Sequence, residues 1–99
     1  MNFNGYETKT TAWEDFSIAD RFGESAIQET YKSLLNFCGT NYIYRTELTM
    51  ILNWKIWQHY ESNDLKIAKI YNDLWEKEDQ WCCDNLKGKE LDYFYRTTD

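Results

Sequence analysis

The chain has 99 residues, of which 42% are hydrophobic and 28% charged, with four glycines and no proline. This length predicts one domain over residues 1–99, because a single hydrophobic core usually serves about 100–150 residues. Seventeen acidic residues against eleven basic ones leave a net charge of −6, which repels phosphate backbones and argues against direct nucleic-acid binding.

The sequence contains no recognisable membrane span or secretory signal. No apolar run reaches the roughly 18–20 residues of a transmembrane helix, and residues 1–11 lack a basic segment followed by an apolar one. The three cysteines, Cys38, Cys82 and Cys83, form an odd set. We expect reduced thiols in a cytoplasmic compartment.

The N-terminal part predicts an irregular arm and a first helix. Residues 1–10 are polar and include a glycine, which favours an irregular N-terminal arm. Thr11 and Glu14 have the spacing of a capping box, which predicts that a helix starts at residue 12 and runs to residue 22. Gly23 is suited to end this helix, because glycine readily takes the left-handed conformation found there.

A second helix is expected from about residue 25 to residue 38. Ser25 and Gln28 repeat the capping-box spacing at its start, and Gly39 is suited to end it. Apolar residues recur inside it at helical spacing and predict one face turned toward the core: Ile27, Tyr31, Leu34, Leu35 and Cys38.

Residues 42–61 form the longest apolar stretch, and its apolar side chains point in nearly all directions around a helix. One side of the helical wheel carries Ile43, Met50, Trp54 and Trp57, and another carries Tyr44, Leu48, Ile51 and Leu52. A helix that is apolar nearly all round is a buried one. We therefore expect a central helix here. A strand over 42–51 is the alternative, but the length of the stretch favours helix.

A turn at residues 62–64 is followed by a fourth helix, expected over 65–86, and a short terminal helix from residue 89 to residue 95. The apolar side of the fourth helix consists of Ile67, Ile70, Tyr71, Leu74, Trp81 and Cys82. Together these elements predict an all-α fold. Its architecture is a compact bundle of four to five helices around one largely buried central helix.

Acidic residues gather at two places that predict a charged surface for a protein partner. Glu14 and Asp15, together with Asp20, lie on the first helix. On the fourth helix, Asp73, Glu76 and Asp79 recur every three residues along one side, with Asp84 further on. Solvated helix faces commonly carry such residues, so the alternative is a surface with no binding role.

Glu78 differs from the other acids because its wheel position falls between Leu74 and Trp81, inside the apolar side of the fourth helix. A buried carboxylate needs a partner, or else its pKa rises. We expect an ion pair or hydrogen bond to Arg45, Lys55 or a tyrosine hydroxyl. A functional carboxylate in a ligand pocket is the alternative.

The sequence carries no recognisable catalytic, metal-binding or cofactor-binding motif. The single histidine, His59, stands beside aromatic residues, which is typical of a packed residue. Neither the histidine nor the three cysteines have the spacing of a zinc site, and no phosphate-binding loop or serine-nucleophile motif occurs. We therefore expect a protein that is not an enzyme and that holds no metal or cofactor.

Aromatic residues make up 18% of the chain, which is more than a small core is expected to hide. Tyr93, Phe94 and Tyr95 are consecutive, so a helix cannot turn all three inward. Exposed tyrosine beside acidic residues is typical of protein-binding surfaces. Tyr93 and Tyr95 are therefore candidate partner-binding residues.

The segment from Thr10 to Phe16 (TTAWEDF), followed by the segment from Ile18 to Gly23 (IADRFG), resembles small uncharacterised proteins of phages and prophages in Gram-positive bacteria. The stretch from Trp57 to Glu61 (WQHYE) and the ending Arg96 to Asp99 (RTTD) are similar in the same way. In general character the chain resembles anti-CRISPR and anti-restriction inhibitors, many of which occupy nucleic-acid grooves as mimics of DNA.

These observations favour a small acidic inhibitor or adaptor of phage type, which acts by stoichiometric binding to a bacterial protein with a basic surface. An anti-CRISPR protein that blocks a CRISPR effector is the most specific form of this hypothesis. The alternative is a structural or assembly protein, such as a homodimer, that associates through its aromatic surface. A small ligand-binding or enzymatic bundle that uses Glu78 ranks third.

Overall fold

The computed structural model describes residues 5–98, and the side chains of residues 12–98. Five helices make up this part of the chain, and it contains no strand. They are α1 (Gly5–Ala19), α2 (Glu24–Cys38), α3 (Tyr42–Glu61), α4 (Leu65–Asn85) and α5 (Lys89–Thr98). The all-α fold class predicted from the sequence is confirmed.

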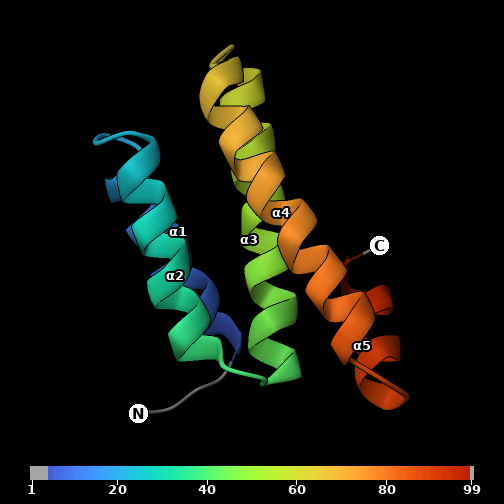
Figure 1. Ribbon diagram of the computed structural model, residues 1–99. Helices are drawn as coiled ribbons and strands as arrows, with labels where there is room; N and C mark the ends of the chain where they lie inside the picture. Colours follow the sequence, from blue (N-terminus) through green and yellow to red (C-terminus); the bar gives the residue numbers. More distant parts are fainter. Residues whose placement is uncertain (1–4, 99) are drawn as a thin grey trace.

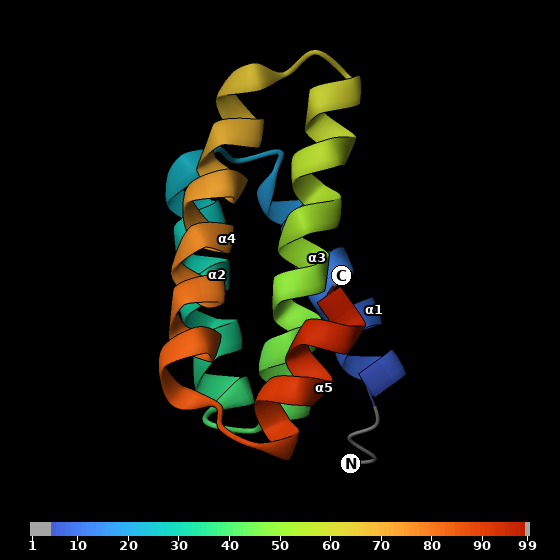
Figure 2. The ribbon, with the colours of Figure 1, turned by 90° about the vertical axis from the view of Figure 1, so that its right-hand side faces the viewer.

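Helix α3 is central and packs against all four other helices. Helix α4 runs antiparallel beside it in a long hairpin, while α1 and α2 pair on its other side (Figure 1). Seen from the right-hand side of that view, the short α5 crosses only the lower half of α3 (Figure 2). The upper half of α3 is therefore left without a covering helix on this side.

The turn between α3 and α4 forms where the sequence predicts it. Asn63 takes the left-handed conformation at φ 60°, which asparagine tolerates better than most residues. Asp64 caps α4 by accepting a hydrogen bond from the backbone N–H of Ile67 at 3.2 Å. Asn41 caps α3 in the same way, with the backbone N–H groups of Ile43 and Tyr44 as donors. These polar caps set where the two long helices begin.

The start of α1 differs from the prediction. The helix begins at Gly5, so the irregular arm predicted for residues 1–10 is wrong over residues 5–10, and residues 1–4 lie outside the described part. Thr11 and Glu14 consequently lie inside the helix and do not form a capping box at its start. The helix also ends at Ala19, three residues before the predicted end. Packing against α2 and α3 outweighs the weak local signals of polar residues.

The predicted capping box at the start of α2 is also wrong. The N-cap is Gly23, which adopts φ 96°, and no side chain caps the helix. Because α1 ends only a few residues earlier, the tight connection needs a glycine conformation, and α2 begins at Glu24 before Ser25 can act as a cap.

The main core lies between the first four helices, where α1, α2, α3 and α4 contribute Phe16, Ile27, Leu52 and Tyr71 among others. A smaller core of Cys82, Leu86 and Phe94 joins α4 to α5. Among residues 5–98, no helix combines the length and the apolar character that crossing a bilayer requires.

Helix α3 is buried nearly all round only in its first half, where every residue from Tyr44 to Thr49 is buried. In the second half, Trp54 is 44% exposed and Trp57 is 57% exposed, although the wheel predicts both in the core. The physical reason is the shortness of α5, which crosses only the first half of α3 (Figure 2), whereas both tryptophans belong to the second half.

Candidate functional site

Glu78 lies in the core, 0% exposed, at the position on α4 that the helical spacing predicts. Arg45 on α3 donates two hydrogen bonds to it, from Nε to Oε2 at 3.0 Å and from Nη2 to Oε1 at 2.9 Å. The Tyr31 hydroxyl on α2 donates a third, to Oε1 at 2.9 Å. The carboxylate thus joins three helices.

Two further contacts hold the guanidinium of Arg45. Its central carbon lies 3.7 Å from the ring centre of Trp81, so the indole stacks on the cation. Its Nη1 donates to the backbone carbonyl of Gly39 at 3.0 Å, just before α3. One arginine therefore satisfies a buried carboxylate, an aromatic face and a loop carbonyl together. These contacts describe a structural unit in which every group already has a partner.

The ionisation of this cluster fits a static role. Burial raises the pKa of the Glu78 carboxyl, while the Arg45 guanidinium and the Tyr31 hydroxyl act in the opposite direction. Burial, assisted by the nearby carboxylate, also raises the pKa of Cys38 and of Cys82 to about 12. Thiols with such pKa values stay protonated at neutral pH and are poor nucleophiles.

A second buried cluster surrounds Lys55, which is 0% exposed on α3. Its Nζ lies 2.7 Å from Oδ2 of Asp20, and Nε2 of His59 lies 2.9 Å from the same oxygen. The Tyr71 hydroxyl donates to the other carboxylate oxygen of Asp20. The Lys55 ammonium also lies 4.6 Å from the ring centre of Trp13. A single carboxylate therefore contacts the Lys55 ammonium, the His59 ring and the Tyr71 hydroxyl together.

This second cluster departs from the sequence interpretation for Asp20 and Lys55, and agrees with it for His59. Asp20 is not part of a solvated acidic face, because it is half-buried and ion-paired. Lys55 pairs with Asp20 and not with Glu78. His59 is packed as expected, with its ring stacked on Tyr71 at 5.6 Å and nearly parallel. The sequence signal that could have pointed to an internal acid is a lysine inside a helix expected to be buried nearly all round.

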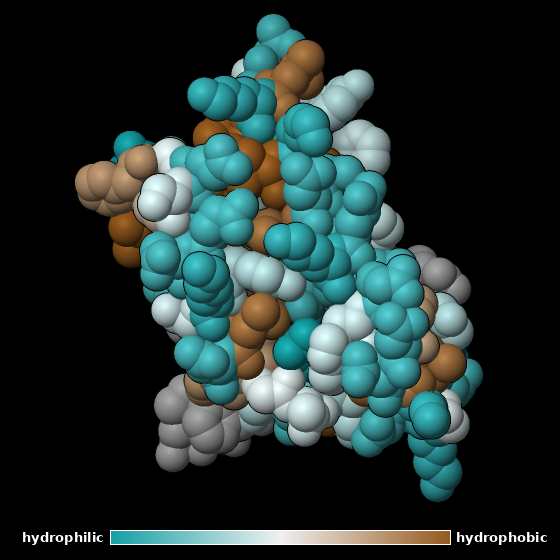
Figure 3. Space-filling view, viewed as in Figure 1, coloured by the Kyte–Doolittle hydropathy of each residue, from teal (hydrophilic) through white to brown (hydrophobic). Residues whose placement is uncertain are grey.

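The three acids predicted as one binding face of α4 divide between two surfaces. Asp73 and Glu76 border a shallow hollow with Trp81, whereas Asp79 lines a separate groove toward α5. Asp73 forms an exposed ion pair with Lys69 at 3.3 Å. Hydrophilic side chains cover the outer face of α4 (Figure 3). A role of these acids in partner binding stays a prediction, but they do not act as one row.

Glu14 and Asp15 are both exposed on α1. Asp15 borders a groove of about 320 Å³ between α1 and α2 that also contains the exposed apolar side chains Ile18 and Phe22. Hydrophobic residues project at this end of the α1–α2 pair (Figure 3). The structure therefore places one predicted acid beside an apolar surface that the sequence did not single out.

The two tyrosines predicted on the terminal helix take different environments. Tyr93 is half-buried and packs edge-on against Tyr42, with ring centres 5.3 Å apart. Tyr95 is exposed, lies with its hydroxyl 3.8 Å from the Cys83 sulfur, and lines a groove between α3, α4 and α5. Phe94, between them, is buried. Of the two tyrosines, Tyr95 thus lines this groove.

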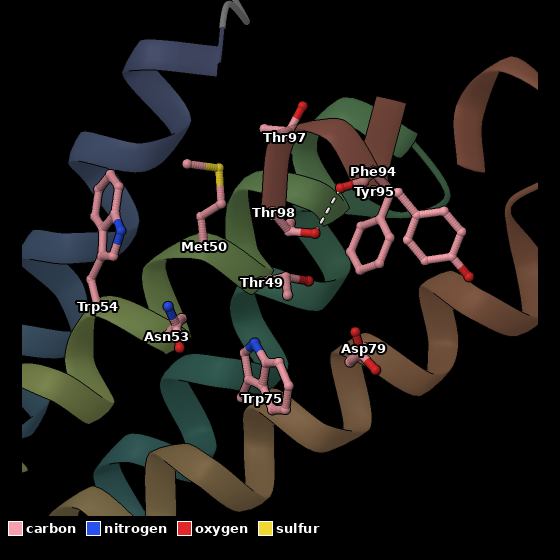
Figure 4. A pocket seen from close by; sticks show the side chains of 10 residues that line it. All are labelled: Thr49, Met50, Asn53, Trp54, Trp75, Asp79, Phe94, Tyr95, Thr97 and Thr98. Carbon is pink, nitrogen blue, oxygen red and sulfur yellow. Dashed lines mark hydrogen bonds between the residues drawn. The ribbon is translucent and has the colours of Figure 1, made fainter. Parts of the chain in front are cut away.

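The groove between α3, α4 and α5 has a volume of about 530 Å³ and is shown from close by in Figure 4. Trp54 and Met50 come from α3, Trp75 and Asp79 from α4, and the remaining wall is the end of α5. The lining also includes Thr49, Asn53, Phe94, Tyr95, Thr97 and Thr98. The groove thus combines aromatic walls with a single carboxylate.

No protein-family model, curated protein or solved structure matches this chain. Within the described residues, no group of three or more His, Cys, Asp or Glu side chains is arranged to hold a metal ion. Function therefore has to be inferred from the arrangement of the chain's own side chains.

An exposed aromatic strip extends the groove along α3, and sequence reasoning missed it. Trp57 is 57% exposed and Tyr60 is 59% exposed, and their rings lie 5.9 Å apart. Trp54, one turn earlier, joins them to the groove. We name Trp54, Trp57, Tyr60 and Trp75 the aromatic face. Its chemistry is suited to recognition, because it offers apolar area and ring faces with a carboxylate alongside.

Proposed function

We propose that this protein is a non-catalytic binding protein that acts stoichiometrically on another protein through the aromatic face. The observation that carries the proposal is the exposure of three large aromatic side chains in the second half of α3, Trp54, Trp57 and Tyr60. Tryptophan and tyrosine dominate binding hot spots because they bring large rigid area with little loss of side-chain entropy. Covering such side chains in a complex removes apolar area from water and so stabilises the complex.

The energy available from this strip is enough for specific binding. Each large aromatic side chain buries roughly 150–250 Å² when fully covered, and each of these three is about half exposed. Covering about 100 Å² of each would contribute about 2.5 kcal/mol per residue at about 25 cal/mol per Å². Association also costs free energy, because the two proteins lose translational and rotational freedom, and this cost offsets part of the contribution from the aromatic side chains. Contacts in the groove and attraction between opposite charges therefore have to contribute as well.

The partner class that fits best is a protein with a basic surface. The chain carries a net charge of −6, and the groove beside the strip presents Asp79. Opposite charges speed encounter and fix orientation, while the aromatic contacts slow dissociation. A bacterial effector that exposes a basic nucleic-acid-binding surface, such as a CRISPR effector, has this character. An inhibitor of phage type is therefore the most specific form of the proposal.

The test combines capture with titration. The protein is used to capture partners from a bacterial lysate containing CRISPR effectors, and each captured protein is then purified and titrated by calorimetry. The double variant Trp57→Ala/Tyr60→Ala removes the strip. Phe22→Ala is the matched control, because Phe22 is an exposed aromatic residue at the α1–α2 end.

We expect a basic partner that binds one to one, with Kd raised by about 100-fold or more in the double variant and unchanged in the control. Binding should weaken from about 50 to about 300 mM salt. Equal binding by the double variant would refute the proposal. Self-association through the same strip is the alternative, and it would show the opposite salt dependence, because salt screens the repulsion between two copies of charge −6.

A further inference from the structure

The groove between α3, α4 and α5 contains a carboxylate that the fold itself does not use. Asp79 is half-buried, and it forms no hydrogen bond or ion pair within residues 12–98, the part whose side chains are described. Figure 4 shows it facing the groove, apart from the other lining side chains. Trp75 lies one helical turn before it on α4, so their Cβ atoms stand about 5–6 Å apart.

A neighbouring side of α4 shows what such a pair of residues can hold. There, Glu78 and Trp81 together bind the guanidinium of Arg45, through two charge-assisted hydrogen bonds and a stacking distance of 3.7 Å. Trp75 and Asp79 present the same two groups, an indole and a carboxylate, one turn apart. No lysine or arginine lines the groove to neutralise them.

The remaining polar groups of the groove also favour a cation. The hydroxyl of Thr98 donates to the backbone carbonyl of Phe94 at 2.7 Å, and that of Thr49 donates to the carbonyl of Arg45 at 3.0 Å. Thr49 is buried, and its oxygen also lies 4.0 Å from the Cys82 sulfur. The Thr98 oxygen, with its proton engaged, is the one left as an acceptor for a ligand. The last turn of α5 ends at the groove, and carbonyl groups at a helix C-terminus carry partial negative charge.

We propose that this groove binds the side chain of an arginine residue presented by a partner protein, with Asp79 as the ion-pair acceptor and Trp75 as the stacking surface. The proposal deepens the proposed function and rests on it, because the groove is continuous with the aromatic face through Trp54. A planar guanidinium can stack on an indole and pair with both oxygens of a carboxylate, which a lysine ammonium cannot do. The volume of about 530 Å³ lies within the range of ligand pockets.

The experiment uses small probes and needs no partner. The ¹⁵N-labelled protein is titrated with N-acetyl-arginine methylamide, with the lysine equivalent, and with the citrulline equivalent, which is a neutral near-isostere of arginine. We expect saturable shifts of the Trp75 indole N–H and the Asp79 amide with the arginine probe at about millimolar Kd. The lysine probe should bind more weakly, and the citrulline probe should not saturate.

Two variants with the same change of charge complete the test. Asp79→Asn should raise the Kd of the arginine probe by about tenfold or more. Asp73→Asn, on the same helix but outside the groove, should leave it unchanged. Equal binding of arginine and citrulline probes, equal binding of arginine and lysine probes, or no effect of Asp79→Asn would overturn the proposal. The titration contains no partner protein, so its failure would overturn the arginine site alone. Failure of the capture experiment would instead count against the proposed function.

Discussion

Replacing Arg45 by methionine gives the sharpest test of the buried ion pair. Arg45 is 6% exposed and supplies two of the three hydrogen bonds to Glu78. Methionine keeps much of the apolar volume and removes the charge, so the variant leaves a buried carboxylate without a cation. The carbonyl of Gly39 also loses its donor. Breaking one partner of such a pair costs about 3–5 kcal/mol.

That loss is large relative to the total stability of a small domain, which is about 5–15 kcal/mol. For a chain of this length each kcal/mol moves the melting temperature by about 4–8 °C, so we expect a fall on the order of 20 °C at pH 7. The measurement is thermal and urea unfolding followed by circular dichroism. Arg96→Met is the matched control, because Arg96 forms an exposed ion pair with Asp92 at 3.0 Å. Its effect should stay below about 0.5 kcal/mol.

The variant should also depend on pH in a defined direction. Arg45 opposes the rise that burial causes in the pKa of Glu78, so its removal raises that pKa further above the ordinary value of 4.5. The folded state then holds its proton more tightly than the unfolded chain. The contribution of Glu78 to the free energy of unfolding must therefore fall as pH rises from 4.5 through the folded-state pKa. Arg45→Met should lose stability more steeply than wild type over that window.

A double variant separates this reasoning from a mere loss of packing. Arg45→Met/Glu78→Met removes both charges, and replacing a buried pair by apolar residues is commonly neutral or stabilising. It should recover most of the stability that Arg45→Met loses, without the additional pH slope. The reasoning is refuted if Arg45→Met costs less than about 1 kcal/mol, or if its stability rises more steeply with pH than that of wild type.

Two other expectations concern the second cluster and the thiols. Asp20→Asn should cost about 3–5 kcal/mol in urea unfolding, because Lys55 is left buried without its counter-ion, and adding Lys55→Met should restore much of the loss. An unchanged midpoint for Asp20→Asn would mean that another group neutralises the lysine. Iodoacetamide should modify only the exposed Cys83 in the native protein, as read by mass spectrometry, while Cys38 and Cys82, with pKa values of about 12, react only after unfolding. Rapid native labelling of either buried thiol would contradict the packing described.

The sequence by itself determined that the chain folds as helices and which sides of α2 and α4 face the core, because hydrophobic periodicity depends only on local spacing. Residues 42–61 form α3 with the predicted bounds, and Glu78 lies inside the apolar side of α4 as its wheel position indicates. Arg45 and a tyrosine hydroxyl, two of the partners expected for a buried Glu78, both bind its carboxylate. Local signals were weakest at the start of α1, where polar residues proved helical from Gly5 onward.

Only the tertiary structure decided which groups meet and which side of α3 stays uncovered. Lys55 pairs with Asp20, which lies in the turn just after α1 and 35 positions earlier, and no local pattern encodes that contact. Trp54 and Trp57 are exposed because α5 covers only the first half of α3. Each three-residue step along α4 moves the side chain around the helix axis, so Asp73 and Asp79 point in different directions. Because α5 packs beside Asp79, that residue lines the groove, whereas Asp73 borders a separate hollow. Helix formation follows local spacing, whereas a binding surface depends on how far each neighbouring helix extends.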